Sequence, residues 1–203
     1  MPYDEKLTAE KLRRWEKYLT DFKLPTWEEI PDLGLYMEQV TVLMKKYLDY
    51  MPPKLKEEQY ITAAAINNYV RNRFMPKPVS KRYYRVHIAY LIMICTLKQS
   101  LSIALVQSLI PVDIPEEEVR RIYDAYALRY KVTTRYFIEQ VRLVCGPILG
   151  NGETGHFASA DDTSSLIETS AIIGGLSKLL AEKLILLESS VSENPKEEKS
   201  EEK

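Results

Sequence analysis

The chain of 203 residues is 45% hydrophobic and 28% charged, which is ordinary for a globular protein. Its two cysteines, Cys95 and Cys145, are too few for a disulfide framework, and seven glycines are too few for a turn-rich β architecture. The longest hydrophobic run, 86–97, is shorter than the roughly 20 residues that a membrane-spanning helix needs. We therefore expect a mainly α-helical cytoplasmic protein with no membrane partner.

The net charge of −1 is unevenly distributed along the chain. Residues 60–112 contain seven Lys and Arg and no acidic residue, whereas 1–59 and 113–203 carry net charges of −2 and −6. A basic segment inside an acidic protein is the electrostatic signature of polyanion binding.

Two helices are expected before residue 60. Thr8 can cap the first, which ends near Phe22, because a Thr side chain accepts hydrogen bonds from the N–H groups of a first helical turn. Asp32 can open the second, whose hydrophobic residues recur at helical spacing until Pro52 and Pro53 end it.

The acid-free segment predicts a short helix, a loop and a hydrophobic helix. Thr62 can cap the short helix, 63–72. Two prolines then favour extended backbone, so 74–85 is expected to form a compact loop or a two-stranded wing. The hydrophobic helix begins at Tyr83 or Tyr84 and reads as part of the core.

Three more helices are expected before residue 145. Ser102 can cap one over 103–110, and Pro115 suits the first position of the next, where three glutamates complement the helix dipole. Thr133 can cap a third that ends at Val144.

The rest of the chain predicts a glycine-rich loop over 146–162, a helix over 163–188 and a disordered tail over 189–203. The last helix is hydrophobic over a broad arc, so it either completes the core or forms a dimer interface.

The short helix 63–72 has two distinct faces at 100° per residue. Ile66, Tyr69 and Val70 lie on the inner face, which can pack on the hydrophobic helix. The outer face carries small or hydrogen-bonding residues: Ala64, Asn67, Asn68 and Arg71. In a DNA major groove, alanine permits close approach, asparagine can pair with adenine, and arginine can pair with guanine or phosphate. A solvated polar face is the alternative interpretation.

Cations are concentrated in and just before the loop 74–85. They are Arg73, Lys77, Lys81, Arg82 and Arg85. Together with the hydroxyl of Tyr83, they can contact DNA phosphates. A basic surface loop beside a core helix is the alternative.

The order of these elements resembles the MerR-type winged helix-turn-helix. Tyr69 matches the aromatic residue of that family's recognition helix, and Lys81 and Tyr83 match its Arg-x-Tyr wing. The resemblance implies DNA binding, with pairing of two subunits through helices that follow the DNA-binding unit. The family usually has Arg where Asn67 stands and Gly where Arg73 stands.

Local motifs more closely resemble an uncharacterised family of Gram-positive bacterial proteins, a domain of unknown function. The matching motifs are Tyr36–Val40, Ile66–Val70, Pro76–Tyr83, His87–Ile92 and Leu97–Gln99. This likeness covers about 33–135, and DNA binding is implied only through the MerR-like likeness.

No catalytic, cofactor or metal site is expected. Gly150, Gly152 and Gly155 match the letters of a dinucleotide-binding fingerprint, but a helix rather than a strand is expected before them. His87 and His156 are the only histidines, and no Cys/His spacing indicates zinc. We expect His87 to be structural and the protein not to be an enzyme.

The sequence thus predicts a mainly α fold, with a MerR-like winged helix-turn-helix embedded in a helical bundle. Its expected parts are an N-terminal helical extension (1–32), a DNA-binding domain (33–112), a C-terminal helical domain (113–188) and the tail (189–203). The predicted function is sequence-specific transcription regulation, most simply repression, through double-stranded DNA bound by a homodimer, with any small-molecule effector unidentified. The alternatives are a helical protein-interaction module of winged-helix shape that binds no DNA, and a ligand-sensing regulator with a pocket between its C-terminal helices.

Overall fold

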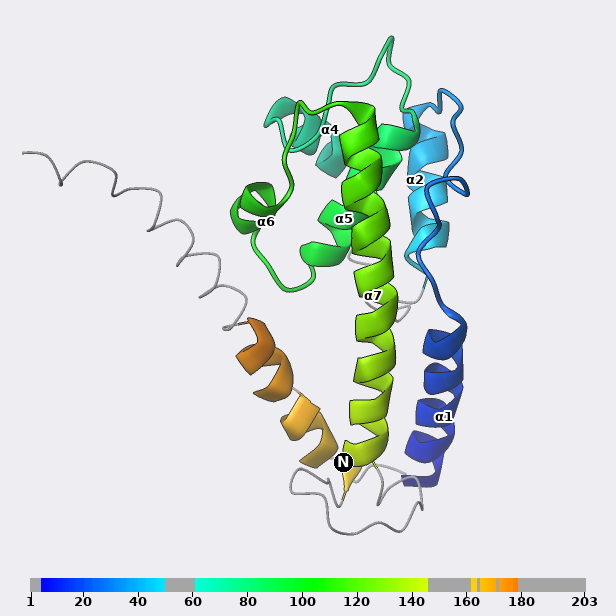
Figure 1. Cartoon of the computed structure of the whole chain (residues 1–203). Coiled ribbons are helices and arrows are strands. Elements are labelled where there is room, and N and C mark those ends of the chain that lie inside the picture. The colour runs from blue at the N-terminus through cyan, green and yellow to red at the C-terminus, as the bar shows by residue number, and fades with distance from the viewer. Residues whose placement is uncertain (1–4, 50–60, 146–161, 164, 171, 179–203) are drawn as a thin grey trace, which may run out of the picture.

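The computed structural model describes residues 5–49, 61–145, 162–163, 165–170 and 172–178, and this part of the chain is mainly helical (Figure 1). The helices are α1 (Glu5–Asp21), α2 (Met37–Tyr47), α4 (Ala63–Arg71), α5 (Arg85–Leu97), α6 (Ile103–Leu109) and α7 (Glu116–Val144). The described residues of 163–178 are also helical. None of these helices is long and hydrophobic enough to cross a membrane.

Helix α5 lies in the middle of the fold, as its composition predicts. Ten consecutive residues, from His87 to Thr96, are buried, so this helix has no solvated face. Helices α2, α6 and α7 contact α5, and α4 contacts α2 (Figure 1). The main cluster of buried residues runs from Leu24 to Tyr123.

Helix α7 is continuous where two helices are expected. Thr133 lies inside it and caps nothing. The hydroxyl of Thr134 instead donates to the Tyr130 carbonyl at 2.9 Å, a bond that a helix interior accommodates. Helix α1 packs along this stretch, with the Trp15 and Phe137 rings edge to face at 6.0 Å. Packing from a distant segment therefore stabilises the continuous helix.

The first two helices begin elsewhere than expected. Helix α1 starts at Glu5, upstream of Thr8. Helix α2 starts at Met37 rather than near Asp32, because Leu35 pairs as extended backbone with Tyr83, with both N···O distances at 2.8 Å.

The caps at Thr62 and Ser102 are confirmed. The side-chain oxygen of each accepts from the backbone N–H three residues later, at 2.9 Å and 3.4 Å. Pro115 is the N-cap of α7, one position before the one predicted. Pro52 and Pro53, the glycine-rich letters 150–155, His156 and the tail 189–203 lie outside the described residues.

Candidate nucleic-acid interface

Helix α4 presents the two faces that its sequence predicts. Ile66 and Tyr69 are buried, at 0% and 2% exposure. On the opposite side, Ala64, Asn67 and Arg71 are exposed and Asn68 is half-buried. We call Ala64, Asn67, Asn68 and Arg71 the outer face of α4.

Asn68 organises the end of this face. Its Oδ1 accepts hydrogen bonds from Nη2 of Arg71 and from Nδ2 of Asn72, both at 2.8 Å. Asn68 thereby orients the Arg71 guanidinium, while the exposed Asn67 amide points outward one position earlier. Asn67 and Arg71 are therefore the two exposed side chains of the outer face that can form hydrogen bonds with a partner.

Helix α4 ends in a Schellman motif. Arg73 adopts a left-handed backbone with φ of 56°. The N–H of Arg73 donates to the Val70 carbonyl at 3.2 Å, and the N–H of Phe74 donates to the Tyr69 carbonyl at 2.8 Å. The Tyr69 and Phe74 rings pack at 6.4 Å, the hydrophobic contact that accompanies this motif. An exposed arginine thus occupies a position at which glycine is usual.

Residues 76–84, which we call the wing, fold back on themselves in a two-residue turn. The N–H and carbonyl of Val79 pair with those of Arg82 at 3.1 and 2.9 Å. Ser80 and Lys81, at the tip, have φ of 51° and 62°, the sign that a type I′ hairpin turn requires at both central residues. The turn leaves the Lys81 side chain exposed.

Arg82, next to the tip of the wing, joins the wing to the segment just before α2. Its Nη2 donates to the Tyr36 hydroxyl at 2.8 Å, its Nη1 donates to the Gly34 carbonyl at 3.3 Å, and its guanidinium lies 4.7 Å from the centre of the Tyr36 ring. Sequence reasoning missed the two partners, although Tyr36 opens one of the local motifs. Part of the Arg82 cation is therefore engaged within the protein.

Tyr83 and Arg85 pack against the rest of the fold and are not exposed on the surface of the wing. Tyr83 is only 3% exposed, and its ring contacts His87 edge to face at 5.6 Å. Arg85 is half-buried, donates from Nε to the Ile30 carbonyl at 2.9 Å and lies over the Trp27 ring. We therefore leave both out of the candidate interface.

Exposed cations remain on α4, on its C-terminal turn and on the wing: Arg71, Arg73, Lys77 and Lys81. Within the part of the chain that the structure describes, the ion pairs are formed by other cations. Figure 1 shows α4 and the wing at the same end of the molecule, with the wing projecting beyond the helices. Lys98 adds a cation behind α4, where its Nζ donates to the Tyr69 hydroxyl at 3.1 Å.

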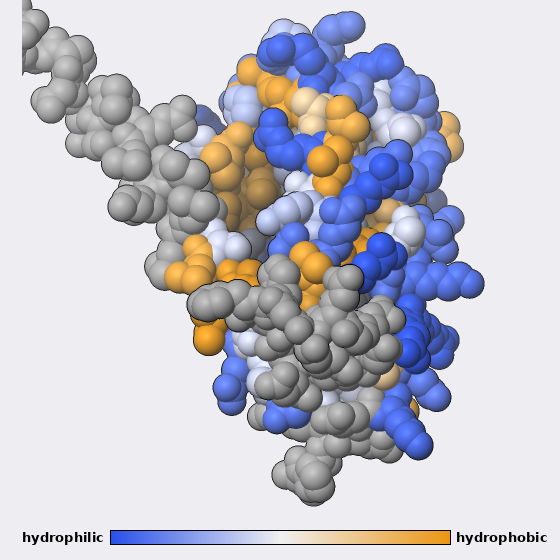
Figure 2. All heavy atoms as spheres, turned by 60° about the horizontal axis from the view of Figure 1, so that its bottom comes forward, coloured by the Kyte–Doolittle hydropathy of each residue, from blue (hydrophilic) through white to orange (hydrophobic). Residues whose placement is uncertain are grey.

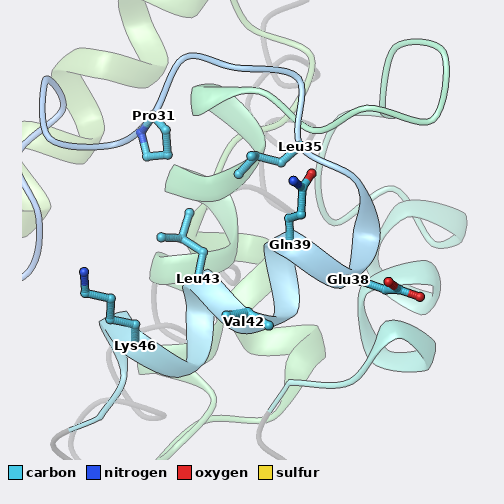
Figure 3. Close-up of a pocket in the computed structure, with 7 residues that line it drawn as sticks. All are labelled: Pro31, Leu35, Glu38, Gln39, Val42, Leu43 and Lys46. Atoms are coloured by element: carbon cyan, nitrogen blue, oxygen red, sulfur yellow. The ribbon is translucent and has the colours of Figure 1, made fainter.

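Helix α2 carries a separate, hydrophobic groove on its outward side (Figure 3). The groove runs between α2 and the preceding loop, with Leu35, Val42 and Leu43 along it and with Glu38 and Lys46 beside them. It is not the pocket between C-terminal helices that a ligand-sensing regulator was expected to have.

Cys95, on α5, is a buried free cysteine. Burial raises the pKa of the Cys95 thiol to about 12, so this cysteine is not a thiolate at neutral pH. Among these residues, no group of three His, Cys, Asp or Glu could hold a metal ion.

A family model described as a domain of unknown function, DUF1836, matches residues 25–127. No curated protein and no solved structure matches the chain.

Proposed function

We propose that this chain, which belongs to the DUF1836 family, is a sequence-specific regulator of transcription that binds double-stranded DNA. The observation that carries the proposal is that Arg71, Arg73, Lys77 and Lys81 are exposed at one end of the molecule. The segment to which they belong, residues 60–112, contains no Asp or Glu that could neutralise them. Cations that are not paired within a protein favour a polyanionic partner.

In this proposal α4 enters the major groove. Asn67 can donate to and accept from one adenine edge, and Arg71 can make two bonds to a guanine. The neighbouring Ala64 removes bulk where the helix approaches the bases. Arg71 arrives already oriented by Asn68, which reduces the entropy lost when it binds.

Arg73, Lys77 and Lys81, with the outer part of Arg82, would contact phosphates on either side of the groove. These contacts position the protein but do not read sequence. The buried Tyr83 and the engaged Arg85 are left out of this set, whereas Arg73, which lies between the end of α4 and the wing, is kept.

A homodimer is part of the proposal. Helix α7 has exposed hydrophobic residues on one face: Leu128, Val132, Tyr136 and Leu143. The helical segment 163–178 adds further exposed isoleucine and leucine, and Figure 2 shows hydrophobic surface around a hollow beside this segment. Exposed patches of this kind favour an interface, and a twofold dimer would present two α4 helices to successive major grooves.

The test is selection of bound duplexes from a random-sequence DNA library, followed by affinity measurements on the selected duplex at several salt concentrations. We expect an enriched motif and a log–log salt slope of roughly −7 for a dimer that neutralises about four phosphates per subunit. Asn67→Ala should relax the sequence preference, whereas Lys77→Glu with Lys81→Glu should abolish binding to all sequences.

The matched control reverses two exposed lysines at the far end of the molecule. Lys11→Glu with Lys17→Glu on α1 makes the same change in net charge (Figure 1). This variant should still bind the selected duplex. A flat salt response, or equal losses in the two double variants, would contradict the proposal.

The groove on α2 favours a second candidate function, a helical protein-interaction module. Its hydrophobic residues include Val42, which is 68% exposed. In that case Val42→Glu would abolish partner binding, and the reversal of Lys77 and Lys81 would leave it unchanged.

A further inference from the structure

His87 is buried at the N-terminus of α5 with both ring nitrogens in hydrogen bonds. The N–H of Tyr84 donates to Nδ1 at 3.0 Å, and Nε2 lies 3.1 Å from the Lys77 carbonyl oxygen. The side chain thus joins the first turn of α5 to the beginning of the wing at Lys77, ten residues earlier in the chain.

These two partners select one tautomer of the ring. A backbone N–H can only donate, so Nδ1 must be the unprotonated acceptor. A carbonyl can only accept, so Nε2 must carry the hydrogen. The neutral Nε2–H tautomer is the one form that satisfies both bonds.

Comparison with α2 shows that only one of these bonds is needed to cap a helix. In α2 the N-cap is also a tyrosine, Tyr36, and its N–H donates to Oε1 of Gln39 at 2.9 Å, three residues later. In α5 the N–H of Tyr84 donates to Nδ1 of His87 in the same way, again three residues later. The hydrogen bond between Nε2 of His87 and the Lys77 carbonyl is therefore not needed to cap α5.

We propose that His87 positions the wing, by tethering the Lys77 carbonyl to the N-terminus of α5. Lys77 stands between Pro76 and Pro78, which limit the backbone on both sides. The tether fixes the entry of the wing, as the pairing of Tyr83 with Leu35 fixes its exit. The orientation of Lys77 and Lys81 toward a polyanion follows from both attachments, and this purpose rests on the proposed function.

Two substitutions separate the tether from the cap. His87→Asn places an acceptor where Nδ1 lies, so it keeps the capping bond, but it is too short to reach the Lys77 carbonyl. His87→Gln is the conservative variant, because its longer amide carries an N–H near the position of Nε2. Gln39→Ala is the matched control, since it removes the equivalent cap from α2 and leaves the tether intact.

Limited trypsin digestion of the folded, full-length chain tests the tether without DNA. Within the wing, trypsin can cleave after Lys81 and Arg82. It does not cleave readily after Lys77, because Pro78 follows. We expect His87→Asn to speed cleavage of the wing by about tenfold, as loss of one buried hydrogen bond shifts a local opening equilibrium. His87→Gln and Gln39→Ala should cleave at close to the original rate. Equal cleavage of His87→Asn and Gln39→Ala would overturn the positioning role.

Affinity for the selected duplex provides the second readout. His87→Asn should bind about tenfold more weakly and His87→Gln nearly as well as the unchanged chain. A loosened wing with unchanged affinity would overturn the link from the tether to DNA contacts. If the unchanged chain bound no duplex, the proposed function would fail, and the digestion would still decide the role of His87.

Discussion

The guanidinium of Arg82 lies 4.7 Å from the centre of the Tyr36 ring, and its Nη2 donates to the Tyr36 hydroxyl at 2.8 Å. This contact joins the start of α2 to the wing across 46 positions of sequence. The sequence predicts that Arg82 contacts DNA phosphates, and the structure shows that this arginine also binds the start of α2. The wing is positioned by α2 as well as by α5.

Gly34→Ala should release Arg82 from this position. A β-carbon at residue 34 would lie 2.8 Å from Cδ and 3.1 Å from Cβ of Arg82, so the arginine would have to move. We expect a loss of about 1 kcal/mol in the free energy of unfolding, typical of a local packing change. Denaturant unfolding measures this loss, and Gly174→Ala, with nothing within 4 Å of the new atom, is the control. Equal effects of the two substitutions would show that the Arg82 contact contributes nothing.

Arg73→Gly should stabilise the protein and weaken its binding to DNA. Glycine adopts the left-handed backbone of Arg73 without strain, so we expect a gain of about 0.5 kcal/mol in the free energy of unfolding after the extra entropy of the unfolded chain is counted. The lost cation should reduce the salt slope of DNA binding by about one per subunit. Arg73→Ala removes the same charge but keeps the β-carbon. It should therefore weaken binding equally and give no stability gain, and a gain from Arg73→Ala would refute the backbone explanation.

The sequence predicted those features of the fold that depend on contacts between residues close together in the chain. Thr62 and Ser102 cap helices because the bonds that define a cap lie within three residues. Thr133 carries the same local signal, yet α7 passes through it, because α1 packs against that region. A cap signal inside a helix cannot be distinguished from a real one without knowledge of distant contacts.

The candidate site likewise contains residues whose exposure could be predicted from neighbouring sequence and residues whose burial depends on distant segments. The outward face of α4 follows from helical periodicity, so the exposure of Asn67 and Arg71 was predictable. The burial of Tyr83 and the engagement of Arg85 by the Ile30 carbonyl depend on a segment about fifty residues away. Whether the protein regulates transcription stays a prediction.

Leu128→Glu with Val132→Glu should convert the proposed dimer into a monomer. Both side chains lie on the hydrophobic face of α7, at 64% and 59% exposure, and two charges there would oppose burial in an interface. Light scattering coupled to gel filtration should show a change from twice the chain mass to the chain mass of 23.6 kDa. Leu33→Glu with Val42→Glu, equally exposed near α2, should leave the mass unchanged. A chain that is already monomeric before substitution would rule out the dimer.

Tyr90 should make the protein lose stability at alkaline pH. Its hydroxyl donates to the Pro111 carbonyl at 2.7 Å, and burial, with a smaller effect of Asp113, raises the pKa of Tyr90 to about 12. Between pH 10 and 12 the unfolded chain releases this proton while the folded chain keeps it. The tyrosine's contribution to stability is therefore complete below pH 10 and is lost as pH rises toward 12.

Tyr90→Phe should lower stability at pH 7 by about 1 kcal/mol through the missing hydrogen bond, and should flatten the decline above pH 10. Denaturant unfolding from pH 7 to 12 measures both effects, and parallel declines in the two proteins would show that the proton of Tyr90 makes no contribution.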